Sequence, residues 1–596
     1  MLQSRVGRTF RSRCSTATQF ASWNRSSTTA GSRRVYFRPT TRAASLQTRA
    51  HHGQPTFSKR TSLNTPRAQA NRRNGPAPIL LQSAFPKKTF VFVVILAGLI
   101  YYLGEEIDLG WTDDVMNSFA VDDAGVTPLQ FFANKEELDH FVAHHVPDTT
   151  GALKDPQIAQ FFSENFDKLA GGWKMSEKDA AEEDMPVTHG CRFKSNEPCE
   201  DYYALGTSPG PGAQPWNYWS IMDGHAGRHT ALFLQWKLIP SVSSALLALP
   251  SHSSAFEVES TIKNTFLRVD KQIMDSARTA ANWFPAANAA AISALTPALS
   301  GSCALLAAFD PSSSTLHVAC TGDSRAVLGR WDPSSQRYTT LPLSEDQTGF
   351  NEKEVARLAA AHPDEPDIID PKTGRLMGIA VTRAFGDHRW KWETDFVRAV
   401  QAKFWGSAPR PKAVSQPYMT AEPEVTETEV VRVAKGEDGR RRSDFMIMAS
   451  DGLWDRISSE HAVECVERWI EARDRGNGEV KNDPQLQAQP SQFGNPMAED
   501  PGMTFDAATG EQVEWKATPE YFAIEDENAA VCLARNAMGG SRRGLFMGVL
   551  SVPPPMGRYA VDDTTIMVVF FDKLDKSAVS SAPKATGVKK SWWKLW

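Results

Sequence analysis

Short apolar runs recur along the chain beyond residue 186, and acidic residues stand at their ends. The runs are YWSIMD (218–223), CALLAAFD (303–310), LHVACTGD (316–323), FMIMASD (445–451) and DDTTIMVVFF (562–571). Apolar runs of this length between turn residues predict buried strands, and residues 311–314 predict a hairpin turn between two of them. Turn or helix-cap chemistry explains one such aspartate, but not its repetition at so many strand ends.

Helical patterns alternate with these strands. The segment 218–234 predicts a strand, a turn at Asp223 and Gly224, and the start of a helix. Further helices are expected over 127–146, over 155–172, which ends in two glycines, and over 351–362.

Length and composition favour one large globular domain with appendages, since the chain has 596 residues, 41% of them hydrophobic and 23% charged. The formal net charge of -5 hides an asymmetry, because no acidic residue precedes Glu105 whereas arginine and serine crowd that region. Such a composition is typical of a mitochondrial transit peptide, so residues 1–88 are predicted to be a disordered targeting arm. Basic tails also bind nucleic acid, but we favour targeting and expect no nucleic-acid partner.

The uncharged run Thr89–Gly104 is a candidate membrane anchor. It is short for a spanning helix of about 17 to 25 residues, but Tyr101 and Tyr102 suit a membrane interface. These features predict a mitochondrial protein anchored in the inner membrane, with its matrix or intermembrane-space orientation left open. Residues 105–186 are expected to be a helical linker or N-terminal extension.

The main domain is expected over residues 187–572, followed by a tail over 573–596. The tail ends in GVKKSWWKLW, whose lysines and tryptophans suit a membrane surface, a docking site for a protein partner, or a solvated chain end. The Ala-rich stretch 277–300 and the polar stretch 476–520 are expected to be surface loops or disordered inserts.

The cysteines favour neither a zinc ribbon nor a complete disulfide framework, because there are seven and none forms a C-x-x-C pair. A cysteine-dependent phosphatase would place an arginine six residues after its nucleophilic cysteine, and no cysteine of this chain has one there.

Carboxylates that converge at strand ends repel one another and are costly to bury unless cations compensate them. Oxygen ligands favour hard ions such as Mg²⁺ or Mn²⁺. Two such ions about 3.5 to 4 Å apart activate water and stabilise a phosphoryl group during in-line attack. Asp223 would then bridge the ions, the Gly224 carbonyl would approach one of them, and His225 would lie next to the leaving oxygen. This arrangement indicates hydrolysis of a phosphate ester.

The motifs CED, MDGHAG, TGDSRAVL, LSEDQ, AVTRAFGD, ASDGLWD and DDTTIMVV follow one another along the chain. In this order they resemble the metal-dependent serine/threonine protein phosphatases of the protein phosphatase 2C (PPM) family, over about residues 187–572. The resemblance implies an α+β fold, a four-layer α/β/β/α sandwich of two antiparallel sheets flanked by helices, with metal ions in a cleft at one end.

The resemblance also implies roles for individual residues. Two Mg²⁺ or Mn²⁺ ions would be held by Glu200, Asp223, the Gly224 carbonyl, Asp451 and Asp562. A third, weaker ion would be held by Asp346 together with Asp451, and His225 would be the general acid. Asp201 and Asp563 would lie beside the metal ligands, whereas Asp323, Arg383 and Asp387 are interpreted first as structural residues.

Many family members carry an arginine that grips the substrate phosphate where this chain has Asn196. Asn196, RWKW and QPYMTAEPEV resemble the mitochondrial pyruvate dehydrogenase phosphatases, which implies pyruvate dehydrogenase E1α as the substrate. An asparagine can donate to phosphate but brings no charge. Two alternatives remain open: another mitochondrial phosphoprotein as the substrate, or a non-catalytic scaffold with the same fold, which would be expected to have lost some of the carboxylates.

Overall fold

The computed structural model describes residues 156–433, 442–476, 479, 503–506 and 508–573. All of them belong to one structural unit, residues 109–596. The predicted targeting arm, the membrane-anchor candidate, the helix over 127–146 and the tail beyond residue 573 lie outside the described residues. In the described ranges, no helix has both the length and the apolar character needed to cross a membrane.

One layer of the fold is a six-stranded sheet, here called sheet A, in which all neighbouring strands are antiparallel. Its strands, in spatial order, are β1 (Trp173–Lys174), β2 (Val187–Phe193), β16 (Thr564–Phe570), β13 (Phe445–Ala449), β9 (Arg325–Asp332) and β10 (Arg337–Pro342). The two central strands are apolar runs next to predicted metal ligands. Strand β13 precedes Asp451, and strand β16 follows Asp562. Every residue of both strands is buried, as the sequence pattern predicts.

The second large sheet, sheet B, has five strands and is also antiparallel throughout. In spatial order they are β12 (Glu424–Glu429), β8 (Thr315–Thr321), β7 (Ala304–Asp310), β4 (Pro215–Met222) and β3 (Tyr202–Pro209). Successive side chains of a strand point to opposite faces. Accordingly Trp219 and Ile221 of β4 lie in the core shared with sheet A, whereas Tyr218 and Met222 pack toward helices. The hairpin predicted at residues 311–314 joins β7 to β8.

Two small sheets complete the strands. The first has the order β11 (Phe385–Gly386), β6 (Gly301–Ser302) and β5 (Gly224–His225), and the second pairs β14 (Met503–Asp506) with β15 (Glu511–Trp515).

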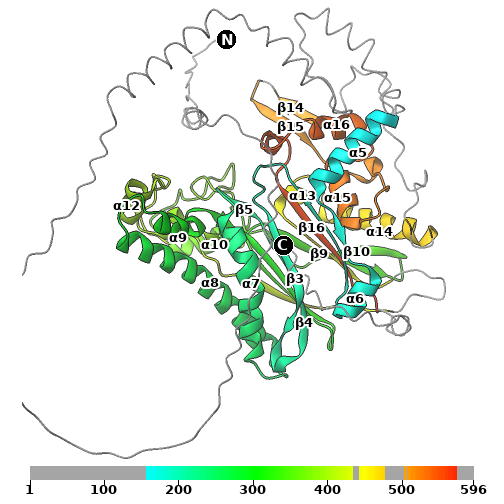
Figure 1. Cartoon of the computed structure of the whole chain (residues 1–596), viewed down its shortest axis with the longest axis horizontal. Helices are drawn as coiled ribbons and strands as arrows, with labels where there is room; N and C mark the ends of the chain where they lie inside the picture. The colour runs from blue at the N-terminus through cyan, green and yellow to red at the C-terminus, as the bar shows by residue number, and fades with distance from the viewer. Residues whose placement is uncertain (1–155, 434–441, 477–478, 480–502, 507, 574–596) are drawn as a thin grey trace, which may run out of the picture. The chain divides into compact units, whose positions relative to one another are not determined.

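Helices lie on the outer faces of both large sheets (Figure 1). The helices are α5 (Pro156–Ala170), α6 (Glu177–Glu183), η1 (Pro211–Ala213), α7 (His229–Leu247), α8 (Ala255–Trp283), α9 (Ala289–Leu299), α10 (Glu352–Ala361), α11 (His388–Lys391), α12 (Thr394–Phe404), α13 (Asp451–Trp454), α14 (Ser459–Arg475), η2 (Pro519–Tyr521), α15 (Ala529–Ala537), α16 (Arg543–Leu550) and η3 (Met556–Tyr559). Helix α7 packs on β3 and β4 of sheet B, and α15 packs on β2 and β16 of sheet A. Helices on two stacked antiparallel sheets confirm the predicted α+β class.

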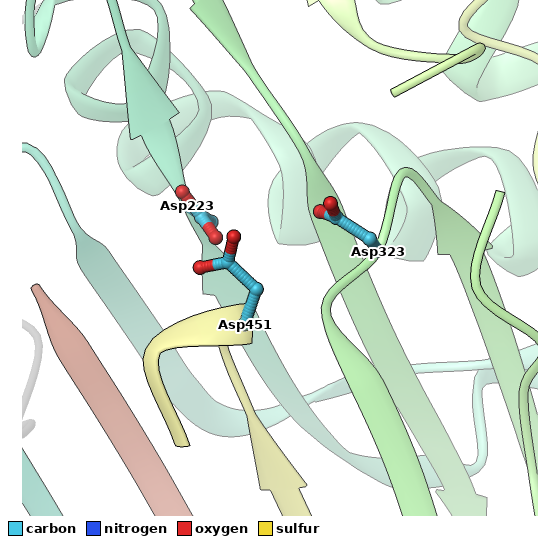
Figure 2. A group of neighbouring side chains, drawn as sticks. All are labelled: Asp223, Asp323 and Asp451. Carbon is cyan, nitrogen blue, oxygen red and sulfur yellow. The ribbon is translucent and has the colours of Figure 1, made fainter. Parts of the chain in front are cut away.

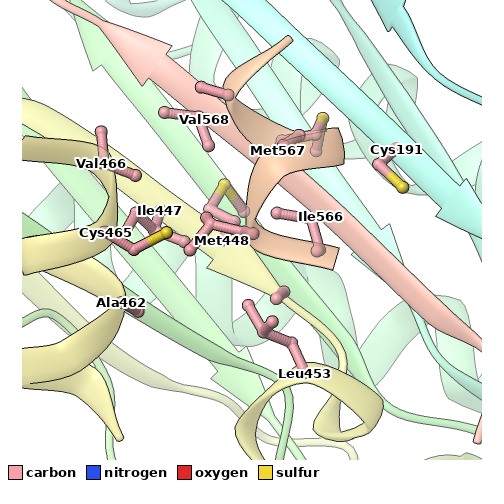
Figure 3. Packing of buried hydrophobic residues seen from close by; sticks show 14 of the residues in the cluster. Cys191, Ile447, Met448, Leu453, Ala462, Cys465, Val466, Ile566, Met567 and Val568 are labelled. Atoms are coloured by element: carbon pink, nitrogen blue, oxygen red, sulfur yellow. The ribbon is translucent and has the colours of Figure 1, made fainter. Parts of the chain in front are cut away.

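The largest hydrophobic core joins the inner faces of both sheets with α14 and α15. Figure 3 shows its middle, where Ile447 and Met448 of β13 lie beside Ile566 of β16, with Cys465 and Val466 of α14 nearby. The six cysteines among the described residues are all free and buried, so none forms a disulfide. Burial raises the pKa of Cys191 and of Cys320 far above the usual value, which makes these thiols poor nucleophiles.

The expectation of a surface loop over 277–300 is wrong. This stretch contains the end of α8 and all of α9, and Ala277, Ala281, Ala291 and Ala298 are buried in the core that covers sheet B. Alanine has the highest helix propensity and its small side chain allows helices to approach closely, so an Ala-rich segment between helices extends the helical layer.

Part of the insert 476–520 and segments before residue 187 also take part in the fold. In the insert 476–520, the described residues include the hairpin of β14 and β15, and Trp515 is buried in the large core. On the N-terminal side, β1 pairs with β2, and Phe166 of α5 lies in the same core. These elements pack on the main domain, and the boundary at residue 187 stays a prediction.

Candidate active site

Strand direction brings the acidic residues to one end of the two sheets. Strands β4 and β8 both run antiparallel to β7, so they end on the same side of sheet B. Asp223 and Asp323, which follow these strands, therefore lie at the same end of the sheet. In sheet A, β13 and β16 are antiparallel neighbours, so Asp451 after β13 lies at the same end as Asp562 before β16.

Asp223, Asp323 and Asp451 form a group in which each offers one carboxylate oxygen and these oxygens lie within 4.8 Å of one another. Figure 2 shows the carboxylates of Asp223, at the end of its strand, and Asp451, on the first turn of α13, pointing toward each other, with Asp323 facing them across the gap. Burial, together with the neighbouring carboxylates, raises the pKa of Asp223 and of Asp451 well above the usual range. Three acids whose ionisation is mutually opposed are the chemistry that a cation relieves.

Glu200 is positioned by a loop that Asp563 holds in place. The Asp563 carboxylate accepts hydrogen bonds from the backbone N–H groups of Ser195 at 2.9 Å, Asn196 at 3.0 Å and Glu200 at 2.8 Å. The Glu200 side chain in turn accepts a hydrogen bond from the Gly227 N–H at 2.8 Å. Asp563 therefore acts as an internal cap that fixes the backbone from which Glu200 reaches the site.

The main chain packs closely at two glycines of this region. A Cβ on Gly224 would overlap the Glu200 carbonyl, and one on Gly452 would lie 2.5 Å from the Asp563 carbonyl oxygen. These two glycines allow the turn after β4 and the first turn of α13 to approach the Glu200 and Asp563 segments directly.

Asp201 is buried beside the group and accepts a hydrogen bond from Ser450 Oγ at 2.7 Å. Burial and the charge of Asp563 raise the pKa of Asp201, although Ser450 opposes this shift. Ser450 precedes Asp451 in the chain, so this hydrogen bond joins the start of β3 in sheet B to the end of β13 in sheet A.

His225 and Asp387 form a hydrogen-bonded pair, with 2.7 Å between His225 Nε2 and Asp387 Oδ2. The small sheet creates this contact, because Gly301 of β6 pairs with His225 of β5 on one side and with Gly386 of β11 on the other. A Cβ on Gly301 would overlap both His225 Nε2 and Asp387 Oδ2. Asp387 therefore orients His225. The motifs that contain these two residues do not by themselves reveal this contact.

Asp323 lies with Asp223 and Asp451 in this group, although its sequence context predicts a structural residue. Asp346, which the family resemblance assigns to a third ion, forms a two-contact ion pair with Arg325, with 2.9 Å between Arg325 Nε and Asp346 Oδ1. Arg325 begins β9, and its guanidinium also lies 5.2 Å from the centre of the Trp454 ring. The order of the strands, which the sequence does not reveal, places Asp323 near Asp223, because β8 and β4 both belong to sheet B and end on the same side of it.

Glu200 and Asp562 lie together at the side of the site where Arg558 contacts both. The distances are 2.8 Å from Arg558 Nη1 to Glu200 Oε2 and 3.4 Å from Arg558 Nη2 to Asp562 Oδ2. Glu200, Asp223, Asp323, Asp451 and Asp562 offer oxygen atoms alone, a donor set that suits a hard divalent cation such as Mg²⁺ or Mn²⁺.

Stacked antiparallel sheets flanked by helices, with clustered carboxylates and an oriented histidine at one end, form an arrangement suited to the hydrolysis of a phosphate ester. The family model for protein phosphatase 2C matches residues 173–489, more than half of the chain. The chain therefore belongs to the protein phosphatase 2C family, and its family and homologues indicate a protein serine/threonine phosphatase. Enzymes of this family are generally dependent on Mg²⁺ or Mn²⁺.

Relatives with curated names agree with this family. A protein phosphatase 2C homolog of Schizosaccharomyces pombe is 34% identical, over 64% of this chain and 79% of the relative. The mitochondrial pyruvate dehydrogenase (acetyl-transferring) phosphatase 1 of Saccharomyces cerevisiae is 33% identical, over 61% of this chain and 64% of the relative. The human mitochondrial phosphatase 2 of the same name is 30% identical, over 43% of this chain and 45% of the relative. The match thus spans less than two thirds of each of these two pyruvate dehydrogenase phosphatases.

Proposed function

We propose that this protein is a Mg²⁺- or Mn²⁺-dependent serine/threonine phosphatase of mitochondria that dephosphorylates pyruvate dehydrogenase E1α. The observation that carries the metal dependence is the group of Asp223, Asp323 and Asp451, whose carboxylates share one small space. Divalent ions bound there would supply Lewis-acid activation of water and would neutralise charge on the phosphoryl group.

The described residues suggest a division of ligands. Asp223, Asp451 and Asp562, with Glu200 and the Gly224 carbonyl, remain the proposed ligands of two ions. For a third ion beside Asp451, Asp323 is a better candidate than Asp346, because Arg325 already neutralises Asp346. Asp201 and Asp563 would hold the ligand-bearing segments in register through their bonds to Ser450 and to the backbone before Glu200.

His225 would donate a proton to the leaving oxygen of the serine or threonine. Its imidazole keeps a partly exposed position, with 22% of the side chain accessible, while Asp387 is almost fully buried behind it. A buried carboxylate that accepts from one ring nitrogen holds the ring in one orientation and favours the protonated form.

The substrate and the organelle rest on the relatives. Two of those reported above are named as mitochondrial pyruvate dehydrogenase phosphatases, and Asn196 and the RWKW segment resemble that group. The basic arm 1–88 supports mitochondrial targeting, and Thr89–Gly104 supports a membrane anchor. An anchor that stops in the inner membrane would leave the domain in the intermembrane space, whereas E1α lies in the matrix, so the proposal requires a matrix-facing domain.

The proposal is tested with full-length protein and a phosphoserine peptide from E1α. Turnover is expected with Mg²⁺ or Mn²⁺ and is expected to stop with excess EDTA. In cells that lack the protein, E1α phosphorylation should rise. In mitoplasts from wild-type cells, the catalytic domain should resist protease. Turnover in EDTA would overturn the metal dependence, whereas unchanged E1α phosphorylation with a protease-accessible domain would overturn the substrate alone.

A further inference from the structure

Arg558 places a positive charge directly on two of the proposed metal ligands. It lies in η3, four residues before Asp562, and contacts Glu200 and Asp562 through different guanidinium nitrogens. The two carboxylates come from segments 362 residues apart in the chain, so one guanidinium joins two segments that are distant in sequence. Its side chain keeps 41% of its surface exposed, so solvent and ligands can reach it.

The backbone that carries Arg558 is held tightly although the side chain is partly free. A Cβ on Gly557 would lie 2.7 Å from the carbonyl oxygen of Ser195, so η3 packs directly on the residue before Asn196. On the other side, Arg456 Nη2 donates to the Ala560 carbonyl at 2.8 Å. A fixed backbone with a half-exposed guanidinium is an arrangement that can exchange partners without moving the fold.

Three other arginines among the described residues at this end of the sheets interact with other groups. Arg325 is held by Asp346 and lies over Trp454, and Arg383 is buried in an ion pair with Glu354. Arg192 donates to the backbone carbonyls of Asp201 and Cys199. Among the contacts of the described residues, Arg558, in contrast, is paired only to carboxylates for which a divalent cation would compete.

We infer that Arg558 binds the phosphoryl group of the substrate, which rests on the metal-dependent function proposed above. A guanidinium presents its N–H groups as a planar fork that matches two phosphate oxygens, as it matches two carboxylate oxygens here. Cations bound to Glu200 and Asp562 would weaken the hold of these carboxylates on Arg558 and release its donors to the phosphate. The neighbouring Asn196 adds no charge, and its amide oxygen already accepts from the Glu197 N–H at 2.9 Å. Arg558 therefore supplies the charge that Asn196 lacks.

Calorimetric titration of inorganic phosphate into the Mn²⁺-loaded full-length protein tests this role. Arg558→Ala should weaken phosphate binding about 10- to 100-fold, the effect of losing charge-assisted hydrogen bonds. The phosphate affinity of Arg558→Lys should lie between those of the wild type and Arg558→Ala, because lysine keeps the charge but lacks the planar pair of donors. Arg278→Ala is the matched control, since Arg278 is 39% exposed and contacts Glu393 at 2.8 Å; its phosphate affinity should equal that of the wild type.

A second titration, of Mn²⁺ without phosphate, separates substrate binding from a purely structural clamp. Loss of Arg558 removes a competitor for Glu200 and Asp562, so Mn²⁺ affinity should be kept or increased. Unchanged phosphate affinity in Arg558→Ala, or Mn²⁺ affinity that falls as much as phosphate affinity, would overturn the inference. If thermal unfolding shows that the alanine variant does not fold, Arg558→Lys decides by the same two titrations. Wild-type protein that binds no divalent ion would overturn the proposed function instead.

Discussion

His225 and Asp387 come from motifs 162 residues apart and meet through one hydrogen bond. Burial of the imidazole lowers the pKa of His225, but the charge and hydrogen bond of Asp387 raise it, and the net pKa lies above its usual value. A general acid works only while it is protonated, so its contribution is present below this pKa and is lost as the pH rises through it.

Asp387→Asn is expected to shift the pH profile of kcat for a phosphopeptide. Without the carboxylate, the pKa of His225 falls, so the alkaline limb of the profile moves to lower pH. The loss at alkaline pH should approach that of removing a general acid, about 10²- to 10⁴-fold.

p-Nitrophenyl phosphate provides the control, because its leaving group needs little protonation. Its profile should change much less in the same variant. A uniform loss of activity at every pH, on both substrates, would show that Asp387 has a structural role alone.

At the same scale, the sequence predicted some site residues better than others. Asp223 and Asp451 are each preceded by an unmistakable apolar run, and the structure brings them together as the pattern predicts. Asp323 and Asp346 were harder to rank, because both are acidic residues after a strand. Only the ion pair of Asp346 with Arg325 and the strand order of sheet B separate them.

Among the elements, the three-stranded sheet of β5, β6 and β11 is one that the sequence did not predict. Each of its strands has two residues, too few to produce a periodic pattern. Its register nevertheless decides where His225 lies relative to Asp387.

Gly301→Ala tests this element. The added Cβ would overlap His225 Nε2 and Asp387 Oδ2, so the pair must separate. We expect kcat for the phosphopeptide to fall by about 10²- to 10⁴-fold, as for loss of the general acid, with Mn²⁺ affinity retained.

Gly544→Ala is the control, because a Cβ there meets no atom within 4 Å and α16 tolerates alanine. This variant should keep full activity. Full activity of Gly301→Ala as well would contradict the importance of the His225 and Asp387 contact.

At the scale of the whole molecule, the direction and order of the strands determine where the acidic residues meet, more than any single motif does. Apolar runs predicted the buried central strands, and turn residues predicted the hairpin of β7 and β8. The helical layer over 277–300 was not predicted, because an Ala-rich segment has too little contrast between its faces to distinguish a packed helix from a loop. The stacking of sheets A and B then brings Asp223, Asp323 and Asp451, which are distant in sequence, to one acidic end.

The acidic end of the two sheets is proposed to bind divalent cations, and calorimetric titration of Mn²⁺ tests this most directly. Full-length wild-type protein should bind Mn²⁺, while Asp223→Asn and Asp451→Asn should each lose most of that binding and remain folded by circular dichroism. Asp395→Asn is the matched control, since Asp395 is 93% exposed and pairs only with Arg398 among the contacts of the described residues, and it should bind as the wild type does. Equal Mn²⁺ affinity in wild type, Asp223→Asn and Asp451→Asn would show that these carboxylates do not form a divalent-cation site.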